Sequence, residues 1–142
     1  MKVNHKGIQC AGVAISLCLL GCAPVGSASS ARLDLAQLTL HPWVDVAAAQ
    51  DRKPVSLVFK DANSVSGHAG CNGYFGKVTI QAESVTFAQV GLTRMMCEPE
   101  SMDTESRYMK ALDATRSARI DKGVLELIDV KGKVLWRFKP LT

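Results

Sequence analysis

Alternation of hydrophobic and polar residues dominates the chain from about residue 38 onward, and this period of two is typical of β-strands. The first two strands are predicted at residues 43–46 and 55–59. Gly132 lies between two later candidate strands and predicts a β-hairpin there. The later strands are predicted at residues 64–66, 74–80, 84–90, 119–120, 124–128 and 134–138.

Residues 101–116 break this pattern and predict one main helix. The segment contains neither glycine nor proline, and Met102, Glu105 and Met109 recur at roughly helical spacing. Acidic residues gather near its start, and Arg116 lies at its end, a distribution that suits the helix dipole. The pattern therefore predicts one helix set in a run of antiparallel strands.

The N-terminal segment predicts a secretory signal. Basic residues within positions 1–6 precede an apolar run at residues 8–20, which is too short to span a bilayer comfortably. Residues 19–22, Leu-Leu-Gly-Cys, resemble the lipobox of bacterial lipoproteins. This resemblance implies cleavage before Cys22 and acylation of that cysteine. An ordinary signal peptide, cut several residues later, is the alternative.

Three segments follow from this assignment: a lipoprotein signal peptide at residues 1–21, the lipidated Cys22 with a flexible tether at residues 22–37, and a folded domain at residues 38–142. The tether is predicted because its residues are mostly small and polar. Ala23, rather than aspartate, follows the cysteine, which by the rule of enteric bacteria favours the outer membrane. We therefore expect the protein in the bacterial cell envelope, facing the periplasm and anchored by its acyl chains.

The cysteine count changes once the signal is set aside. Of five cysteines, Cys10 and Cys18 leave with the signal peptide and Cys22 is lipidated. The remaining pair, Cys71 and Cys97, predicts a disulfide in an oxidising compartment. Closing that loop is worth roughly 3 kcal/mol by the chain-entropy relation.

The charge distribution argues against a nucleic-acid partner. The formal net charge of the chain is +4, but two of its 17 basic residues, Lys2 and Lys6, lie in the signal segment. The basic residues that remain are scattered, whereas phosphate binding requires them to be gathered on one face. Aromatic residues make up only 6% of the chain, too few for a base-stacking surface.

The glycine-rich run at residues 66–76, SGHAGCNGYFG, admits several chemistries. A phosphate loop is disfavoured because a strand, not a helix, is predicted to follow it. A nucleophile made of Cys71 and His68, and a zinc site made of those residues with Cys97 and His41, remain alternatives to the disulfide. We expect a structural turn, an exposed and solvated His68, and no metal, cofactor or catalytic residue.

Four methionines, Met95, Met96, Met102 and Met109, cluster around Cys97 and the predicted helix. We expect them to fill the core between helix and sheet. Promiscuous apolar binding and copper binding are the alternatives, because the thioether is both adaptable and a soft ligand.

Three ordered motifs resemble the META domain family. Residues 67–76 are similar to its glycine–cysteine–asparagine signature, and residues 93–97, Thr-Arg-Met-Met-Cys, are similar to its second signature. Glu105 and the residues after it match its helix. Met96 stands where the family commonly has alanine. The resemblance covers residues 38–140 and implies structural roles for Gly67, Gly70, Asn72, Gly73, Tyr74, Gly76, Thr93, Met95 and Glu105.

The resemblance implies an α+β, mainly β fold: a strongly curved antiparallel sheet of roughly six to eight strands with one main helix packed against it. The bacterial relatives are HslJ-like heat-shock-associated proteins, often membrane-anchored or periplasmic, and the family has no established enzyme activity. We therefore predict a non-enzymatic envelope lipoprotein with a binding or scaffolding role, in envelope stress or antibiotic tolerance, whose partner is an envelope protein or lipid. The alternatives are a small apolar-ligand or lipid binder that uses the concave face of the sheet and, third, an uncharacterised enzyme.

Overall fold

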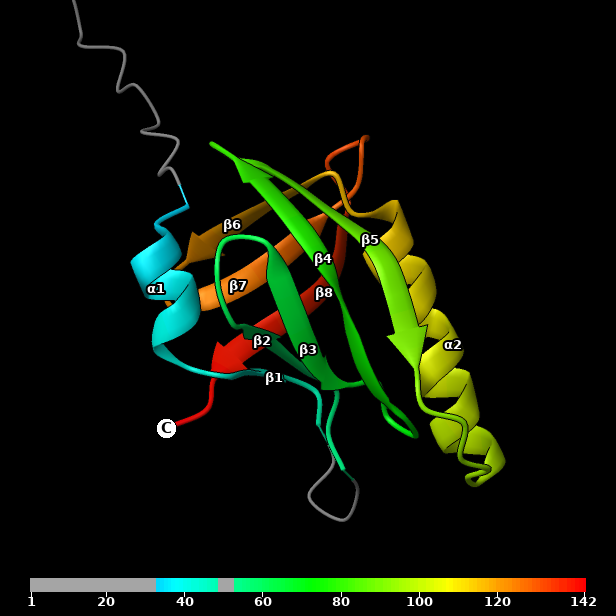
Figure 1. Ribbon diagram of the computed structural model, residues 1–142. Helices are drawn as coiled ribbons and strands as arrows, with labels where there is room; N and C mark the ends of the chain where they lie inside the picture. Colours follow the sequence, from blue (N-terminus) through cyan, green and yellow to red (C-terminus); the bar gives the residue numbers. More distant parts are fainter. Residues whose placement is uncertain (1–32, 49–52) are drawn as a thin grey trace, which may run out of the picture.

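The computed structural model describes residues 33–48 and 53–142. The predicted signal peptide, Cys22 and the greater part of the predicted tether lie outside these residues. The described residues form two helices and eight strands (Figure 1). In chain order these elements are α1 (Leu35–Leu40), β1 (Trp43–Asp45), β2 (Ser56–Phe59), β3 (Ser64–His68), β4 (Gly73–Gln81), β5 (Ser84–Leu92), α2 (Pro99–Ala114), β6 (Ser117–Asp121), β7 (Val124–Ile128) and β8 (Val134–Pro140).

The strands form a closed antiparallel barrel in which every strand pairs with the next one along the chain. The predicted fold class, mainly β with antiparallel strands and one main helix, is confirmed. The sheet goes further than the strong curvature that was predicted: it closes into a barrel, because β1 also pairs with β8 and so joins the two edge strands. That pairing sets Trp43 opposite Pro140 and Asp45 opposite Phe138. Closure leaves neither strand as an unpaired edge.

The barrel has one weak seam, between β5 and β6. These strands share a single paired position, Ser84 with Ser117, whereas β4 and β5 pair along most of their length. Helix α2 connects β5 to β6 and lies along β5 (Figure 1), and it also contacts β7 and β8. The helix therefore covers the part of the barrel that the strands leave open.

Side chains fill the interior of the barrel, as expected for a barrel of this size. Inward-facing residues alternate along the strands, for example Leu57 and Phe59 of β2 and Leu125 and Leu127 of β7, all buried. Tyr108 and Leu112 of α2 join the same core. The concave face of the sheet is thus occupied by the protein's own core.

Helix α2 begins and ends about two residues earlier than predicted. Pro99 occupies its first turn, where a proline costs no intrahelical hydrogen bond. The helix stops at Ala114, and Arg116 donates from Nη1 to the carbonyl oxygens of Asp113 and Thr115 (both 2.7 Å). Within the described ranges, neither this helix nor α1 has the length and apolar character needed to cross a membrane.

Helix α1 was missed by the sequence analysis, which assigned residues up to 37 to the tether. Asp34 caps it by accepting a hydrogen bond from the Ala36 backbone N–H (2.9 Å). Leu38 is fully buried, and its carbonyl oxygen accepts a hydrogen bond from the Trp43 indole (3.0 Å). The helix is therefore packed against the barrel, and the folded unit begins before residue 38.

Candidate functional site

The glycine-rich run is the β3–β4 hairpin. Strand β3 ends at His68 and β4 begins at Gly73, so residues 69–72 form the turn, closed by the Ala69 N–H donating to the Asn72 carbonyl (2.8 Å). Gly70 has φ 105°, a conformation that side-chain-bearing residues rarely adopt. The predicted turn is present, and a strand follows it, so the run lacks the helix N-terminus of a phosphate loop.

Gly67 is required by close packing rather than by conformation. A Cβ atom there would lie 2.0 Å from the Ser56 carbonyl oxygen and 2.8 Å from Cε1 of Tyr74. The backbone of β2 therefore occupies the space that a side chain would need. Gly73 is different, because a Cβ there would meet nothing closer than the Gly67 carbonyl oxygen at 3.8 Å.

Asn72 joins the hairpin turn to α2. Its backbone N–H donates to Oε2 of Glu105 (2.7 Å), and its side-chain Nδ2 donates to Oε1 of the same carboxylate (3.3 Å). Both residues are buried, with 2% and 8% of their surface exposed. Hydrogen bonds from two donors compensate the carboxylate for its loss of hydration.

Asn72 also holds the loop between β5 and α2. Its Oδ1 accepts from the Met95 N–H (2.7 Å) and from the Thr93 hydroxyl (2.9 Å), while Nδ2 donates to the Met95 carbonyl (3.3 Å). One side chain thus connects the hairpin, the loop and the helix. We call Asn72, Thr93, Met95, Glu105 and the Cys71–Cys97 pair the signature cluster.

The expected disulfide between Cys71 and Cys97 is formed, with an S–S distance of 2.01 Å and a sequence separation of 26. Neither sulfur is then a free thiolate, which the alternative nucleophile and zinc site both require. Among residues 33–48 and 53–142, no group of three or more histidine, cysteine, aspartate or glutamate side chains is placed to hold a metal ion.

His68 is buried, which corrects the expectation of a solvated side chain. Only 9% of its surface is exposed, and its Nδ1 accepts the Gly70 backbone N–H (3.2 Å). Burial lowers the pKa of the imidazole below its ordinary value, and the positive charge of Lys53 lowers it further. The neutral ring therefore supports the turn through its acceptor nitrogen.

Two buried tyrosines lie beside the signature cluster. The Tyr74 hydroxyl donates to the Ser56 carbonyl (2.9 Å) and accepts from the Tyr108 hydroxyl (2.8 Å). Burial raises the pKa of both hydroxyls, so they remain protonated donors. The Tyr108 ring also packs edge-on against Trp136, with ring centroids 5.1 Å apart. These contacts fix α2 against β4 and β8.

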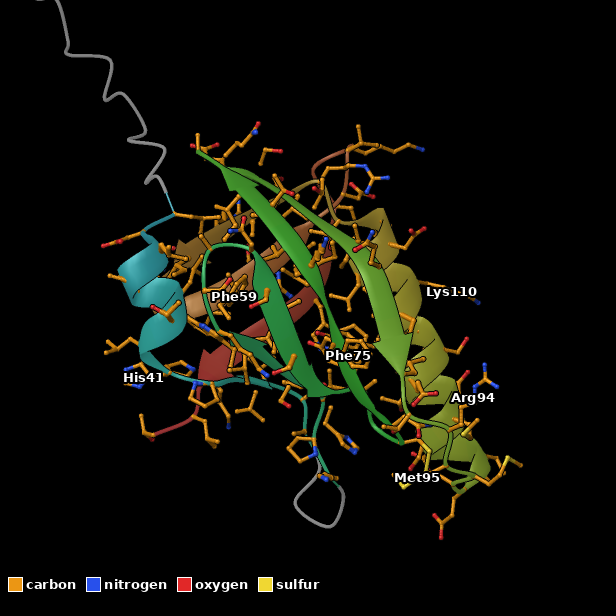
Figure 2. The ribbon with its side chains drawn as sticks, in the orientation of Figure 1. His41, Phe59, Phe75, Arg94, Met95 and Lys110 are labelled. Carbon is orange, nitrogen blue, oxygen red and sulfur yellow. A yellow bond between two sulfur atoms is a disulfide. The ribbon has the colours of Figure 1, made fainter. Side chains whose placement is uncertain are left out.

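The methionines do not all fill the core, contrary to prediction. Met109 packs against the core, but Met95 is 54% exposed and Met96 is 92% exposed. Figure 2 shows Met95 and Arg94 together beside the first turns of α2, on the side of the molecule away from His41. Met102, at the start of α2, lines the same hollow as Met95 and Met96.

A groove of about 430 Å³ lies on the other side of the signature cluster, where α2 crosses the end of the barrel. We call it the mouth groove. The Trp136 indole forms part of its wall, and its Nε1 is the buried side-chain polar atom without a hydrogen-bond partner in the described part of the chain. The groove is lined by residues 45–48 at the end of β1, 53–55 before β2, 134–137 of β8, Gly70, and Glu100, Ser101, Thr104 and Arg107 of α2.

Sequence reasoning missed the mouth groove. Its residues come from separate segments, and no spacing rule connects Lys53, Arg107 and Trp136. The signal available in the sequence was the glycine at position 70. Gly70 has a positive φ and lies between the groove and the signature cluster. That glycine packs against α2, since a Cβ there would lie 3.1 Å from Cγ2 of Thr104.

A comparison with protein-family models matches the META domain to residues 31–140. The chain belongs to the META domain family. The match spans both signature motifs and α1, and it starts before the domain boundary expected at residue 38. The META signature of this chain therefore includes the network of hydrogen bonds and the disulfide described above.

Two structures solved by NMR share the fold. One, described as the structure of a protein from Burkholderia xenovorans, is 21% identical, with 96% of this chain and 98% of that chain covered and a TM-score of 0.61. The other is 20% identical, with 76% of this chain and 95% of that chain covered and a TM-score of 0.63. At such identities the similarity concerns the fold alone. A comparison with curated proteins gave no match.

Proposed function

We propose that this protein is a non-enzymatic lipoprotein of the bacterial cell envelope whose META domain binds a partner at the mouth groove. The observation that carries this proposal is that the chemically versatile side chains of the signature are already engaged in bonds within the protein. Cys71 and Cys97 are joined to each other, His68 accepts a hydrogen bond within its own turn, and Glu105 holds Asn72. These side chains stabilise the fold, so we propose that the partner binds at the neighbouring mouth groove.

The chemistry of the mouth groove favours a ligand with an apolar part and a polar or charged group. Val46 and Leu135 contribute apolar surface, Lys53 and Arg107 contribute positive charge, and Asp45 and Glu100 contribute negative charge. Arg107 is also paired with Asp103 (3.0 Å). Buried polar groups without a partner are rare in native proteins, and the buried indole N–H of Trp136, a residue that lines the groove, has none among the described residues. The volume falls within the usual range of small-molecule sites, about 300–1,000 Å³.

An apolar-ligand site on the concave face of the sheet is less well supported. Leu57, Leu125 and Phe138 are fully buried inside the barrel, so a ligand there would have to displace the core. A lipid or other amphiphile remains a reasonable ligand at the mouth groove instead. A role in envelope stress or antibiotic tolerance would fit such a binding protein.

Membrane attachment through Cys22 rests on the lipobox at residues 19–22. Labelling cells with radioactive palmitate should place label on the wild-type protein and none on Cys22→Ser. Globomycin should cause the uncleaved precursor to accumulate. Label retained by Cys22→Ser would contradict attachment at this residue.

Binding at the mouth groove is tested by native mass spectrometry of protein released gently from membranes. Val46→Asp places a charge on the groove wall at a side chain that is already 42% exposed. Val130→Asp is the matched control, because Val130 is 81% exposed and does not line the groove. We expect wild type and Val130→Asp to retain the same bound molecule and Val46→Asp to lose it. Equal retention by all three proteins would contradict the proposal.

A further inference from the structure

We propose that Met95, Met96 and Met102 form a binding site for a soft monovalent metal ion, Cu(I) or Ag(I). Three of the four methionines in the described part of the chain line one hollow of about 590 Å³ between the end of β5 and the start of α2. This site is separate from the mouth groove, and the proposal does not depend on the proposed function.

The exposure of these side chains is the first argument. Met96 is 92% exposed and Met95 is 54% exposed, so neither thioether is occupied by core packing. Met109, in contrast, packs against the hydrophobic core. Methionine has three rotatable side-chain bonds, so exposed thioethers can reorient toward a common ligand at little cost.

The backbone beneath these side chains is held firmly, which is the second argument. Asn72 binds both the N–H and the carbonyl of Met95, at 2.7 and 3.3 Å. Cys97, on the other side of Met96, is fixed by its disulfide to Cys71. Two thioethers are therefore presented from a fixed loop, and the third comes from the adjoining helix. A fixed backbone lowers the entropy lost when the side chains converge.

The donor type determines which metal ions fit. Thioether sulfur is a soft and uncharged ligand, which favours Cu(I) over magnesium or calcium. Glu105 also lines the hollow, but both of its oxygens accept hydrogen bonds from Asn72. Arg94 lines the hollow as well, and its positive charge opposes a bound cation. Removing that charge should therefore strengthen binding.

An apolar partner is the competing occupant of the same surface, and leucine substitutions separate the two. Leucine retains the apolar character and approximate volume of methionine but lacks the sulfur. A metal site should be lost on Met→Leu substitution, whereas an apolar docking surface should be retained. Met109→Leu serves as the matched control, because it makes the same change outside the hollow.

The experiment is a titration of the full chain with Ag(I), which needs no reductant. Cys10, Cys18 and Cys22 are replaced by serine, since free thiols would compete for the ion. Methionine methyl groups are followed by carbon–proton NMR, and affinity is measured by calorimetry. We expect one ion per chain and shifts of the Met95, Met96 and Met102 methyl signals, with the Met109 signal unchanged.

The variants determine the outcome. Loss of an outer-shell partner typically lowers metal affinity 10–100-fold, so replacing a direct ligand, as in Met95→Leu or Met102→Leu, should lower it at least about tenfold. Met109→Leu should bind as the parent does, and Arg94→Ala should bind more tightly. The proposal is overturned if Ag(I) does not bind, or if a Met95→Leu/Met96→Leu/Met102→Leu variant that keeps its disulfide and unfolding midpoint binds as tightly as the parent.

Discussion

The signature cluster and the mouth groove lie on either side of the same turn and differ in almost every physical property. Asn72 and Glu105 at the centre of the cluster are buried, and their polar atoms are paired with one another. The groove mixes charged with apolar residues, and one residue of its wall, Trp136, has a buried indole N–H without a partner in the described part of the chain. The comparison fits two roles: the polar groups of the signature cluster hold the fold, and the groove beside it is the surface that we propose for binding.

The largest effect on stability is expected from substituting a glycine of the signature. Gly67→Ala would place a Cβ 2.0 Å from the Ser56 carbonyl oxygen, so strands β2 and β3 must move apart. We expect a loss of about 3 kcal/mol or more in the free energy of unfolding, measured by urea denaturation. Gly73→Ala, where the nearest atom is 3.8 Å away, should cost about 1 kcal/mol or less. Equal losses for the two variants would contradict the close-packing argument.

Loss of the disulfide is expected to have the next largest effect on the free energy of unfolding. The Cys71→Ser/Cys97→Ser variant should lose roughly 3 kcal/mol of unfolding free energy, because the unfolded chain is no longer restricted by a loop of this length. Reduction of the wild-type protein should lower the urea midpoint to a similar value. Arg107→Ala, at an exposed side chain of the groove, should change stability by no more than about 0.5 kcal/mol. A midpoint unaffected by reduction would show that the disulfide does not stabilise the cluster.

The smallest expected effect is the pH dependence due to His68. Its folded-state pKa lies below the ordinary value of 6.5, so the unfolded chain binds the proton more readily. Stability should therefore fall as the pH drops through that ordinary value toward the folded-state pKa. A proton on Nδ1 would also remove the acceptor for the Gly70 N–H.

His68→Asn is the control for this effect, since its side-chain oxygen can accept the same hydrogen bond without titrating. Urea midpoints from about pH 7.5 to about pH 5.5 should fall more steeply for wild type than for His68→Asn. Identical pH profiles for the two proteins would show that His68 does not cause the loss of stability at lower pH. The carboxylates with lowered pKa values, such as Glu126, contribute at still lower pH.

Much of the fold was predictable because its signals are local. The β7–β8 hairpin is marked by Gly132, which has φ 81°, and both arms are strands, as predicted. Helix α1 was missed because six residues offer little periodicity beyond a single buried leucine and a capping aspartate. Closure of the barrel was missed because it depends on the pairing of β1 with β8, two segments at opposite ends of the domain.

The candidate site was predictable only in part. The Cys71–Cys97 bond follows from counting cysteines, but the burial of His68 does not, because it depends on how α2 and β2 pack around the turn. The exposure of Met96 contradicts the usual preference of methionine for cores. The mouth groove combines segments far apart in the sequence, so no local pattern indicates it.

The central claim is that signature residues act by binding one another, and a double-mutant cycle on Asn72 and Glu105 tests it most directly. Asn72→Ala, Glu105→Ala and the double variant are compared with wild type by urea denaturation. Because the two side chains share a buried hydrogen bond, we predict that the double variant loses less than the sum of the single losses, by at least about 1 kcal/mol. Losses that add within about 0.3–0.5 kcal/mol would contradict the claim.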